Sequence, residues 1–183
     1  MYSLIVFLLT MIFFFFLSRN FTWRLCLKID MFSILSTFNS NYMKLLENKV
    51  AIVTGAVRGI GEAIVLKFAE EGAHVAFTYV SDSSAEKATL LEKRVISMGV
   101  KAKAYKSNAG DFAACEIFVN DVLAAFGTID ICVNNAGISK DNLLLRMSPE
   151  QFEEVIRVNL HSVFYMTKQV IRPMMKAKSG SII

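Results

Sequence analysis

The sequence from residue 43 onward predicts an α/β fold, a doubly wound parallel sheet with helices on both faces. Short apolar runs typical of buried strands alternate with longer stretches of helical periodicity, which indicates successive βαβ units. A glycine-rich segment lies between the first apolar run and the first helix, the place where parallel sheets of this kind bind ligands. We expect an incomplete sheet, with the first four strands and the start of the fifth.

The first two strands and their helices follow from apolar runs bounded by glycine. Residues 50–54 form an apolar run, followed by a glycine-rich turn. The next helix carries apolar residues at helical spacing and ends before Gly72; these residues are Ile60, Ala63, Ile64 and Phe68. Residues 74–79 are the expected second strand, and a polar helix over 84–98 stops at Gly99.

The remaining elements repeat this order. Residues 101–106 alternate as a third strand, a helix over 112–126 is closed by a glycine, and 129–133 form the fourth strand. Ser148-Pro149-Glu150-Gln151 combines a capping box with proline at the first helical position. The next helix therefore begins there and runs toward Met175, with a disturbance expected near Pro173. Residues 180–183 are the start of a fifth strand.

Residues 1–42 differ in composition from the rest and form a separate hydrophobic N-terminal extension, so the two expected regions are 1–42 and 43–183. The apolar run over 4–17 is shorter than the roughly 20 residues of a spanning helix. It has no basic residues before it and no evident cleavage site after it. Two interpretations stay open: a non-native extension upstream of a start at Met43, or a weak membrane anchor.

Composition excludes several kinds of site. The net charge of +4 comes from residues spread along the chain, so nucleic-acid binding is not indicated. The three cysteines, Cys26, Cys115 and Cys132, lie far apart without the spacing of a metal site, and they predict free thiols in a reducing, cytoplasmic setting. His74 and His161 are isolated and are interpreted as structural or solvated. We therefore expect no metal site.

The segment Thr54-Gly55-Ala56-Val57-Arg58-Gly59-Ile60-Gly61 has the properties of a diphosphate-binding turn. Glycine permits a tight turn and a close approach of backbone to ligand. The N–H groups and the dipole at a helix N-terminus favour negative charge. The spacing T-G-x-x-x-G-x-G differs from the G-x-G-x-x-G fingerprint, so these glycines alone leave a purely structural turn open.

Three motifs in order give the sequence a specific resemblance. The glycine segment, then Asn134-Asn135-Ala136-Gly137 and then Val158-Asn159-Leu160 resemble the short-chain dehydrogenase/reductase family, whose domain is Rossmann-type. The resemblance extends over residues 43–183 and implies a truncated NAD(P)-binding domain. Residues 137–147, GISKDNLLLRM, are most similar to the 3-oxoacyl-acyl-carrier-protein reductases of fatty-acid synthesis.

The resemblance implies a role for each motif. The loop over 55–61 would hold the cofactor diphosphate, Asn108 and Ala109 would line the adenine pocket, and Asn135 would face the nicotinamide-side ribose. The implied cofactor-binding residues are Thr54, Gly55, Val57, Arg58, Gly59, Ile60, Gly61, Asn108, Ala109, Asn135, Ala136 and Gly137. Asn159 matches the family's catalytic asparagine, which supports a water in a proton relay where the helix is distorted; an ordinary helix asparagine is the alternative.

The choice of cofactor can be argued from charge. An acidic residue at the end of the second strand would bind the ribose 2′-OH of NAD and repel a 2′-phosphate. Tyr79 occupies that place, and Arg58 in the glycine loop is the nearest partner for the phosphate. NADP(H) is therefore the expected cofactor. Asp82, three residues further along, would weaken this prediction if its loop folded back.

The implied reaction is the NADPH-dependent reduction of a 3-oxoacyl thioester on acyl carrier protein. Complete family members continue into a substrate-orienting Ser and a Tyr-x-x-x-Lys acid/base pair, which this sequence does not contain, so we expect normal catalysis only in an intact protein. Tyr165 and Lys168 are interpreted as packing and solvated surface. The alternatives are a short-chain reductase of another carbonyl compound and a non-catalytic nucleotide-binding fragment tethered to a membrane by residues 1–17.

The resemblance also implies partners. An intact protein would be a homotetramer, and the basic helix end formed by Arg172, Lys176 and Lys178 would contact the acidic acyl carrier protein. A favourable charge at a helix C-terminus is an equal alternative for these cations. The fifth strand is expected to be an unpaired edge with Ile182 and Ile183 exposed, which predicts marginal stability.

Overall fold

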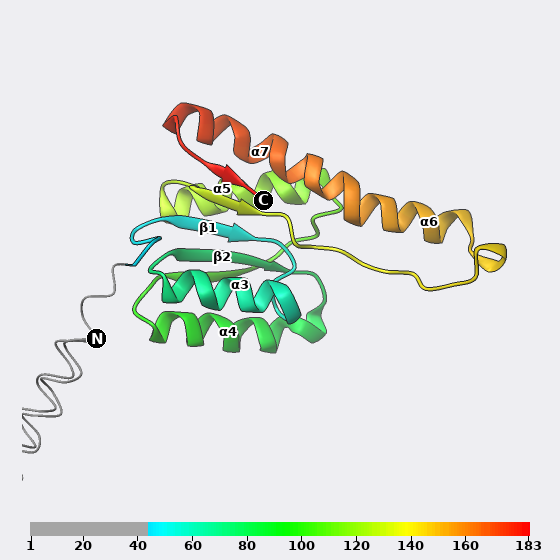
Figure 1. Ribbon diagram of the computed structural model, residues 1–183, viewed down its shortest axis with the longest axis horizontal. Coiled ribbons are helices and arrows are strands. Elements are labelled where there is room, and N and C mark those ends of the chain that lie inside the picture. Colours follow the sequence, from blue (N-terminus) through cyan, green and yellow to red (C-terminus); the bar gives the residue numbers. More distant parts are fainter. Residues whose placement is uncertain (1–43) are drawn as a thin grey trace, which may run out of the picture. The chain divides into compact units, whose positions relative to one another are not determined.

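Five parallel strands form a single sheet in the order β3-β2-β1-β4-β5 in the computed structural model, which describes residues 44–183 (Figure 1). The strands are β1 (Val50–Val53), β2 (His74–Tyr79), β3 (Ala102–Lys106), β4 (Ile131–Val133) and β5 (Ser181–Ile182). The chain builds outward from β1 to β3 and then crosses back to β4, so the strand order reverses between β1 and β4. The predicted doubly wound Rossmann-type sheet is confirmed. The expectations for residues 1–42, including the apolar run and Cys26, lie outside the described residues.

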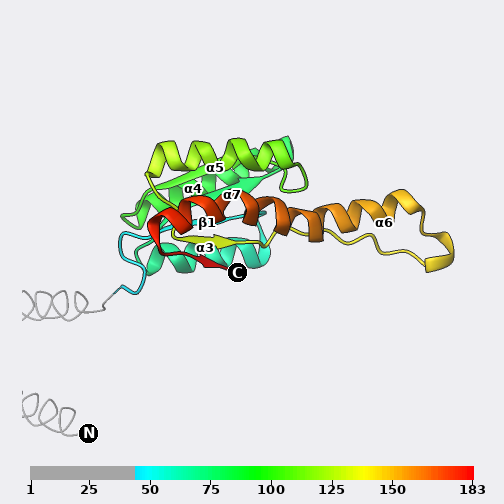
Figure 2. The ribbon, with the colours of Figure 1, turned by 90° about the horizontal axis from the view of Figure 1, so that it is seen from above.

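Helices cover both faces of this sheet, as Figures 1 and 2 show. The helices are α3 (Gly59–Glu70), α4 (Ala85–Ser97), α5 (Phe112–Phe126), α6 (Pro149–Ile156) and α7 (Ser162–Ala177). Val53 and Phe77 pack with residues of α3 and α4 such as Val65. The alternate strand residue Ile52 packs on the other face with Phe118 of α5. Two apolar cores, one on each face, therefore hold the sheet.

Helix α3 packs against the core with some, but not all, of the apolar positions named from the sequence. Its buried residues are Gly61, Val65 and Ala69, whereas Ile60 is 76% exposed. Ile64 and Phe68 are partly buried against the core, whereas Ile60 is not among the residues packed there. Gly61, the next residue, lies close to the loops after β1 and β4, where a side chain would not fit.

The last helical region is interrupted at Asn159, where the resemblance to the family implied a distorted helix, and not at its proline. Ser148 caps α6 through the predicted capping box, with Gln151 N donating to Ser148 Oγ at 3.3 Å and Ser148 N donating to Gln151 Oε1 at 3.1 Å. Residues Arg157–His161 then form a π-helical turn, after which α7 continues through Pro173 to Ala177. The predicted disturbance near Pro173 is wrong. Proline removes one backbone bond of the helix, whereas the π turn inserts extra residues and carries Asn159.

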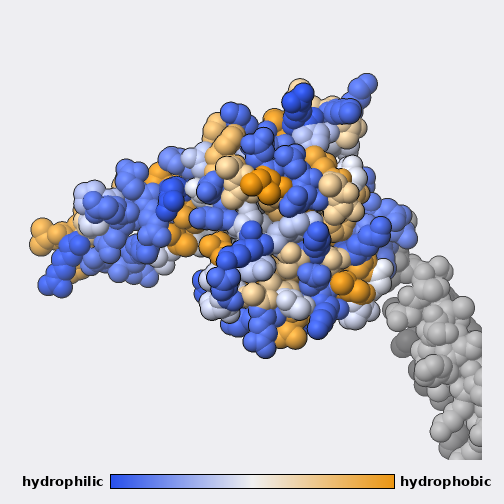
Figure 3. All heavy atoms as spheres, turned by 180° about the vertical axis from the view of Figure 1, so that it is seen from behind, coloured by the Kyte–Doolittle hydropathy of each residue, from blue (hydrophilic) through white to orange (hydrophobic). Residues whose placement is uncertain are grey.

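Residues 138–161 extend beyond the sheet as an arm, which comprises a loop, a short 3₁₀ turn (Leu144–Arg146), α6 and the π turn (Figures 1 and 2). The arm ends in an apolar tip at which Leu143, Leu144 and Leu145 are 66%, 87% and 96% exposed. The space-filling view shows this apolar tip in Figure 3. At the opposite edge of the sheet from β3, Ile182 and Ile183 on the β5 side are 40% and 67% exposed, as predicted. None of the helices between residues 44 and 183 combines the length and apolar character needed to cross a membrane.

Candidate functional site

A cleft of about 680 Å³ lies at the carboxyl ends of β1, β2, β3 and β4. All the predicted cofactor residues except Thr54 line it: Gly55, Val57, Arg58, Gly59, Ile60, Gly61, Asn108, Ala109, Asn135, Ala136 and Gly137. The strand order reverses between β1 and β4, and such a switch point leaves a crevice between neighbouring loops. Segments that lie up to 82 residues apart in the sequence therefore meet at one site.

The glycine loop is fixed by the end of β2. Gly55 N donates to Thr78 Oγ1 at 3.0 Å, and Ala56 N donates to the Thr78 carbonyl at 3.1 Å. Gly55 has a φ of +64°, which favours glycine. A β-carbon on Gly61 would lie 2.5 Å from Asn135 Nδ2 and 2.7 Å from the Gly55 carbonyl oxygen. Both glycines are therefore required by the conformation and the close packing of this loop.

Thr54 is buried beneath the cleft and joins its two central loops. Its Oγ1 accepts hydrogen bonds from the backbone N–H groups of Asn135 and Ala136, both at 3.0 Å. Asn135 Nδ2 donates in return to the carbonyls of Thr54 and Gly55, each at 3.0 Å. Thr54 thus sets the position of the loop after β4 without lining the cleft. Because both amide hydrogens of Asn135 are used on β1, its Oδ1 is the atom left for a ligand.

The N-terminus of α3 opens into this cleft without a side-chain cap. Arg58 occupies the N-cap position and makes no capping hydrogen bond. By contrast, Asp111 caps α5 with Ala114 N donating to its Oδ1 at 3.1 Å, and Ser148 caps α6. A β-carbon on Gly59 would meet no atom within 4 Å. The first-turn N–H groups of α3 therefore face space that an anionic group can occupy.

Hydrogen bonds also fix Asn108 and Ala109, which line the cleft just after β3. Asn108 Oδ1 accepts a hydrogen bond from Gly110 N at 3.0 Å, which turns the chain after the strand. The buried Cys115 thiol donates to the Ala109 carbonyl at 3.3 Å. Burial raises the pKa of Cys115 to about 11, so this thiol keeps its proton and its hydrogen bond at neutral pH. The predicted adenine pocket is therefore a rigid surface.

Asp82, the acidic residue that could oppose binding of NADP, follows the end of β2. Tyr79, Ser81 and Ser84 line the cleft, whereas Asp82 does not. The Asp82 carboxylate forms an ion pair with Lys106 at the end of β3. Arg58 lines the same cleft from the glycine loop. The cleft at this end therefore presents an arginine and hydroxyl groups, with the nearby carboxylate paired outside it.

Asn159 lies in the π turn and makes two hydrogen bonds across the arm. Its Oδ1 accepts from Ile138 N at 2.8 Å, and its Nδ2 donates to the Ile138 carbonyl at 2.9 Å. Asn159 does not line the cleft, but Ile138 does. The Asn159 side chain therefore holds the end of the loop over 135–138. It contacts the cleft indirectly, through Ile138.

The whole of this domain matches a known family. The family model for short chain dehydrogenases matches residues 49–183. The chain belongs to the short-chain dehydrogenase/reductase family. It is 44% identical over 139 residues to the 3-oxoacyl-acyl-carrier-protein reductase FabG of Escherichia coli strain K12, covering 75% of this chain and 54% of that protein.

Further comparisons agree. The corresponding reductase FabG of Staphylococcus epidermidis is 41% identical over 136 residues, which cover 74% of this chain and 55% of that protein. A metagenomic short-chain oxidoreductase solved in complex with NADP has a TM-score of 0.70 and 35% identity, over 75% of this chain and 61% of that one. The chain spans about half the length of the curated relatives that it matches.

The resemblance to the family did not identify every residue of the cleft. Thr78, Val80, Ser81, Ser84, Ser107, Ile138 and Val158 also line it. Thr78 and Ser107 lie at or just after the carboxyl ends of β2 and β3, so their position in parallel strands is a signal that could have found them. Val158 comes from the π turn, and its place in the cleft depends on the path of the arm.

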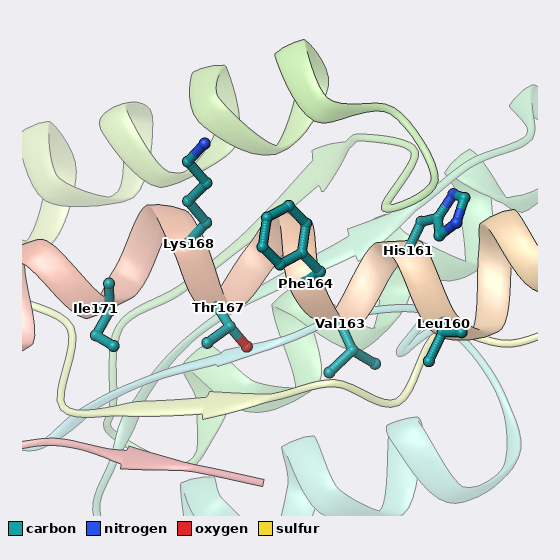
Figure 4. Close-up of a pocket in the computed structure, with 7 residues that line it drawn as sticks. All are labelled: Leu160, His161, Val163, Phe164, Thr167, Lys168 and Ile171. Atoms are coloured by element: carbon teal, nitrogen blue, oxygen red, sulfur yellow. The ribbon is translucent and has the colours of Figure 1, made fainter.

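Another hollow, of about 520 Å³, lies on the outer side of α7 and is lined by apolar side chains together with a histidine, a threonine and a lysine (Figure 4). Its lining residues are Leu160, His161, Val163, Phe164, Thr167, Lys168 and Ile171. Tyr165 packs edge-on against Phe112, and the Lys168 ammonium lies 5.2 Å from the centre of the same ring. Neither Tyr165 nor Lys168 lines the nucleotide cleft. No cluster of metal-ligating side chains occurs among residues 44–183.

Proposed function

We propose that this chain binds NADPH and is the nucleotide-binding part of a reductase that converts a 3-oxoacyl thioester on acyl carrier protein to the 3-hydroxyacyl form. The observation that carries the proposal is the cleft, where the glycine loop, the ends of β2 and β3 and the loop over 135–137 meet. The uncapped α3 offers N–H groups to a diphosphate, and Gly59 leaves the space for it.

The remaining parts of the cofactor fit the same cleft. Asn108 and Ala109 form the floor for adenine, and Arg58 with Ser81 and Ser84 suits the 2′-phosphate of NADP. The bound nicotinamide would supply hydride. Residues 135–137 would lie beside it, with Asn159 holding the loop through Ile138. The solved relative that contains NADP supports this choice of cofactor.

The substrate proposal rests on similarity at the sequence level. Both reductases named above act, by their names, on a 3-oxoacyl group carried by acyl carrier protein. Within this sequence, Asn159 is the residue that matches the family's catalytic set, and the Ser and Tyr-x-x-x-Lys of the family are not among its 183 residues. Reduction is therefore proposed for the intact protein, together with a cytoplasmic location, a homotetramer and contact of the basic end of α7 with the carrier protein.

Direct titration of the cofactor tests the first half of the proposal. NADPH should bind more tightly than NADH to this chain, and Arg58→Gln should remove roughly tenfold of that preference, since a charged contact to phosphate is lost. Lys87→Gln, which removes a cation from α4 outside the cleft, is the matched control. Equal binding of NADH would overturn the NADPH assignment. In the intact protein, acetoacetyl thioesters should be reduced faster than free ketones; the reverse would favour a reductase of another carbonyl class.

A further inference from the structure

Lys106 and Asp82 form an ion pair beside the part of the cleft proposed for the 2′-phosphate. Asp82 begins the short 3₁₀ turn Asp82–Ser84 after β2, and Lys106 is the last residue of β3. The two strands are paired, with Tyr79 opposite Lys106, so the ammonium reaches the carboxylate across the strand ends. The side chain of Asp82 is 88% exposed and that of Lys106 is 51% exposed, so the ion pair lies at the surface.

The turn itself places Asp82 between two residues of the cleft. Ser81 and Ser84 line the cleft, and the Ser81 hydroxyl is 2.8 Å from the Ser84 hydroxyl. Asp82 lies between them in the chain but does not line the cleft. Its carboxylate is directed to Lys106, while the flanking hydroxyls remain on the ligand side.

We infer that Lys106 is a specificity-positioning residue, which favours NADP over NAD by holding the Asp82 carboxylate out of the cleft. This inference rests on the proposed function. A carboxylate free to turn into the cleft would repel a 2′-phosphate and would accept a hydrogen bond from the 2′-OH of NAD. The ion pair therefore acts on cofactor choice through the direction of a neighbouring side chain, and Lys106 itself is not among the residues that line the cleft.

Removing the lysine should change the binding of both cofactors in opposite directions. In Lys106→Met, the dissociation constant of NADP⁺ should rise roughly fivefold and that of NAD⁺ should fall roughly threefold, from one new repulsion and one new hydrogen bond. A lysine that only touched the 2′-phosphate would give the first change without the second. The fall for NAD⁺ is therefore the measurement that separates the two roles.

Three further variants complete the test. Lys106→Met with Asp82→Asn should lose the gain in NAD⁺ binding, because the amide carries no charge. Lys106→Arg should keep the wild-type preference, since it retains the pair. Lys101→Met removes the same charge just before the amino end of β3, away from the cleft, and should change neither constant.

The experiment is calorimetric titration of the full chain with NADP⁺ and NAD⁺, with thermal unfolding of each variant as a check of folding. Unfolding should change little because an exposed pair contributes at most about 1 kcal/mol. If wild type binds NADP⁺ but Lys106→Met leaves NAD⁺ binding unchanged, the inference is overturned and the proposed function stands. If wild type binds neither nucleotide, the proposed function fails and the inference falls with it.

Discussion

The glycine loop over 54–61 and the arm over 138–161 both border the nucleotide cleft, yet they are held in different ways. The loop begins at Thr54 and lies against Thr78, which are 1% and 3% exposed. The hydroxyl groups of these threonines accept hydrogen bonds from three backbone N–H groups, one in the glycine loop and two in the loop after β4. The arm is largely exposed and is tied to the cleft wall by Asn159, whose two hydrogen bonds to Ile138 lie at the surface. The glycine loop is therefore held by buried side chains, whereas the arm is held by hydrogen bonds exposed to water.

This difference indicates how much conformational freedom each of the two regions has. Hydrogen bonds to buried threonines leave the backbone little freedom, so we expect the glycine loop to keep its conformation with or without a ligand. Exposed hydrogen bonds exchange with water at small cost, so the arm can change its position cheaply. We expect substitutions at the loop to cost stability and cofactor binding together, and substitutions in the arm to alter local order with little effect on global stability.

The largest effect should come from Gly61→Ala. The new β-carbon would lie 2.5 Å from Asn135 Nδ2, 2.7 Å from the Gly55 carbonyl oxygen and 2.8 Å from Ala56 Cα. Two of these atoms belong to backbone that cannot move aside, so we expect a loss of about 3 kcal/mol in the free energy of unfolding. Urea denaturation measures it, and nucleotide titration should show binding lost as well.

Gly99→Ala is the matched control for this change. Gly99 has a φ of +87° but its β-carbon would meet no atom within 4 Å, so only backbone strain is added. It should cost about 1 kcal/mol and leave nucleotide binding intact. Equal losses for the two variants would contradict the view that close packing at the cleft requires a glycine at position 61.

Thr54→Val should have the next largest effect. Valine keeps the shape but removes the oxygen that accepts from Asn135 N and Ala136 N, leaving these two N–H groups without their acceptor in a part-buried place. The free energy of unfolding should fall by about 2 kcal/mol. Thr89→Val is the control, because this exposed threonine bonds only the carbonyl of its own helix. A loss below that of Thr89→Val would contradict the view that the loop is held from beneath.

High pH should lower the free energy of unfolding through Cys115, whose thiol donates to the Ala109 carbonyl after β3. Burial raises the pKa of this thiol to about 11, whereas in an unfolded chain it is about 8.5. Above that lower value the unfolded state releases its proton first, so stability falls with rising pH, by about 1.4 kcal/mol per pH unit, until the folded pKa is reached. Unfolding from pH 8 to 10 in wild type and Cys115→Ala should show a steeper fall in wild type; parallel curves would exclude this role.

The regular part of the molecule could be predicted from sequence because periodicity reports burial on both faces of a parallel sheet. Strand β2 and helix α5 have the predicted bounds, and Gly127, which closes α5, has the expected positive φ of 84°. The residues predicted to bind the cofactor lie in one cleft, apart from Thr54, because glycine motifs describe backbone requirements that few other residues satisfy and the resemblance supplied the others. Apolar spacing alone does not show which of these positions are buried: Ile64 and Phe68 pack against the core, whereas Ile60 is exposed.

The rest of the site depends on distant contacts. The sequence suggested Asp82 as an obstacle to NADP, and only the position of Lys106 on the neighbouring strand shows where its carboxylate lies. Likewise, the expectation that Asn135 faces a ribose stays a prediction, and only the structure shows that its Nδ2 donates to the chain just after β1 and leaves Oδ1 free. The proline predicted a disturbance at Pro173, where α7 continues, whereas the resemblance implied a distortion at Asn159, where the π turn at 157–161 lies. The Lys106–Asp82 ion pair and the hydrogen bonds of Asn135 join residues that are distant in the sequence, so they could not be predicted without the fold.

Asn159→Ala should have the smallest effect on stability and should be the clearest test of the arm. Both of its hydrogen bonds to Ile138 are exposed, so water replaces them and the free energy of unfolding should change by less than about 1 kcal/mol. The Ile138 amide should nevertheless exchange its hydrogen at least about tenfold faster, because its acceptor is gone. Asn159→Asp keeps the Oδ1 acceptor and should restore much of the protection. Asn142→Ala removes a side chain that bonds Arg146 and Gln151 within the same arm and should leave Ile138 unaffected. If Asn159→Ala instead destabilised the whole domain as Thr54→Val does, the arm would be part of the folded core, and the proposed division between a fixed nucleotide loop and an adjustable arm would be wrong.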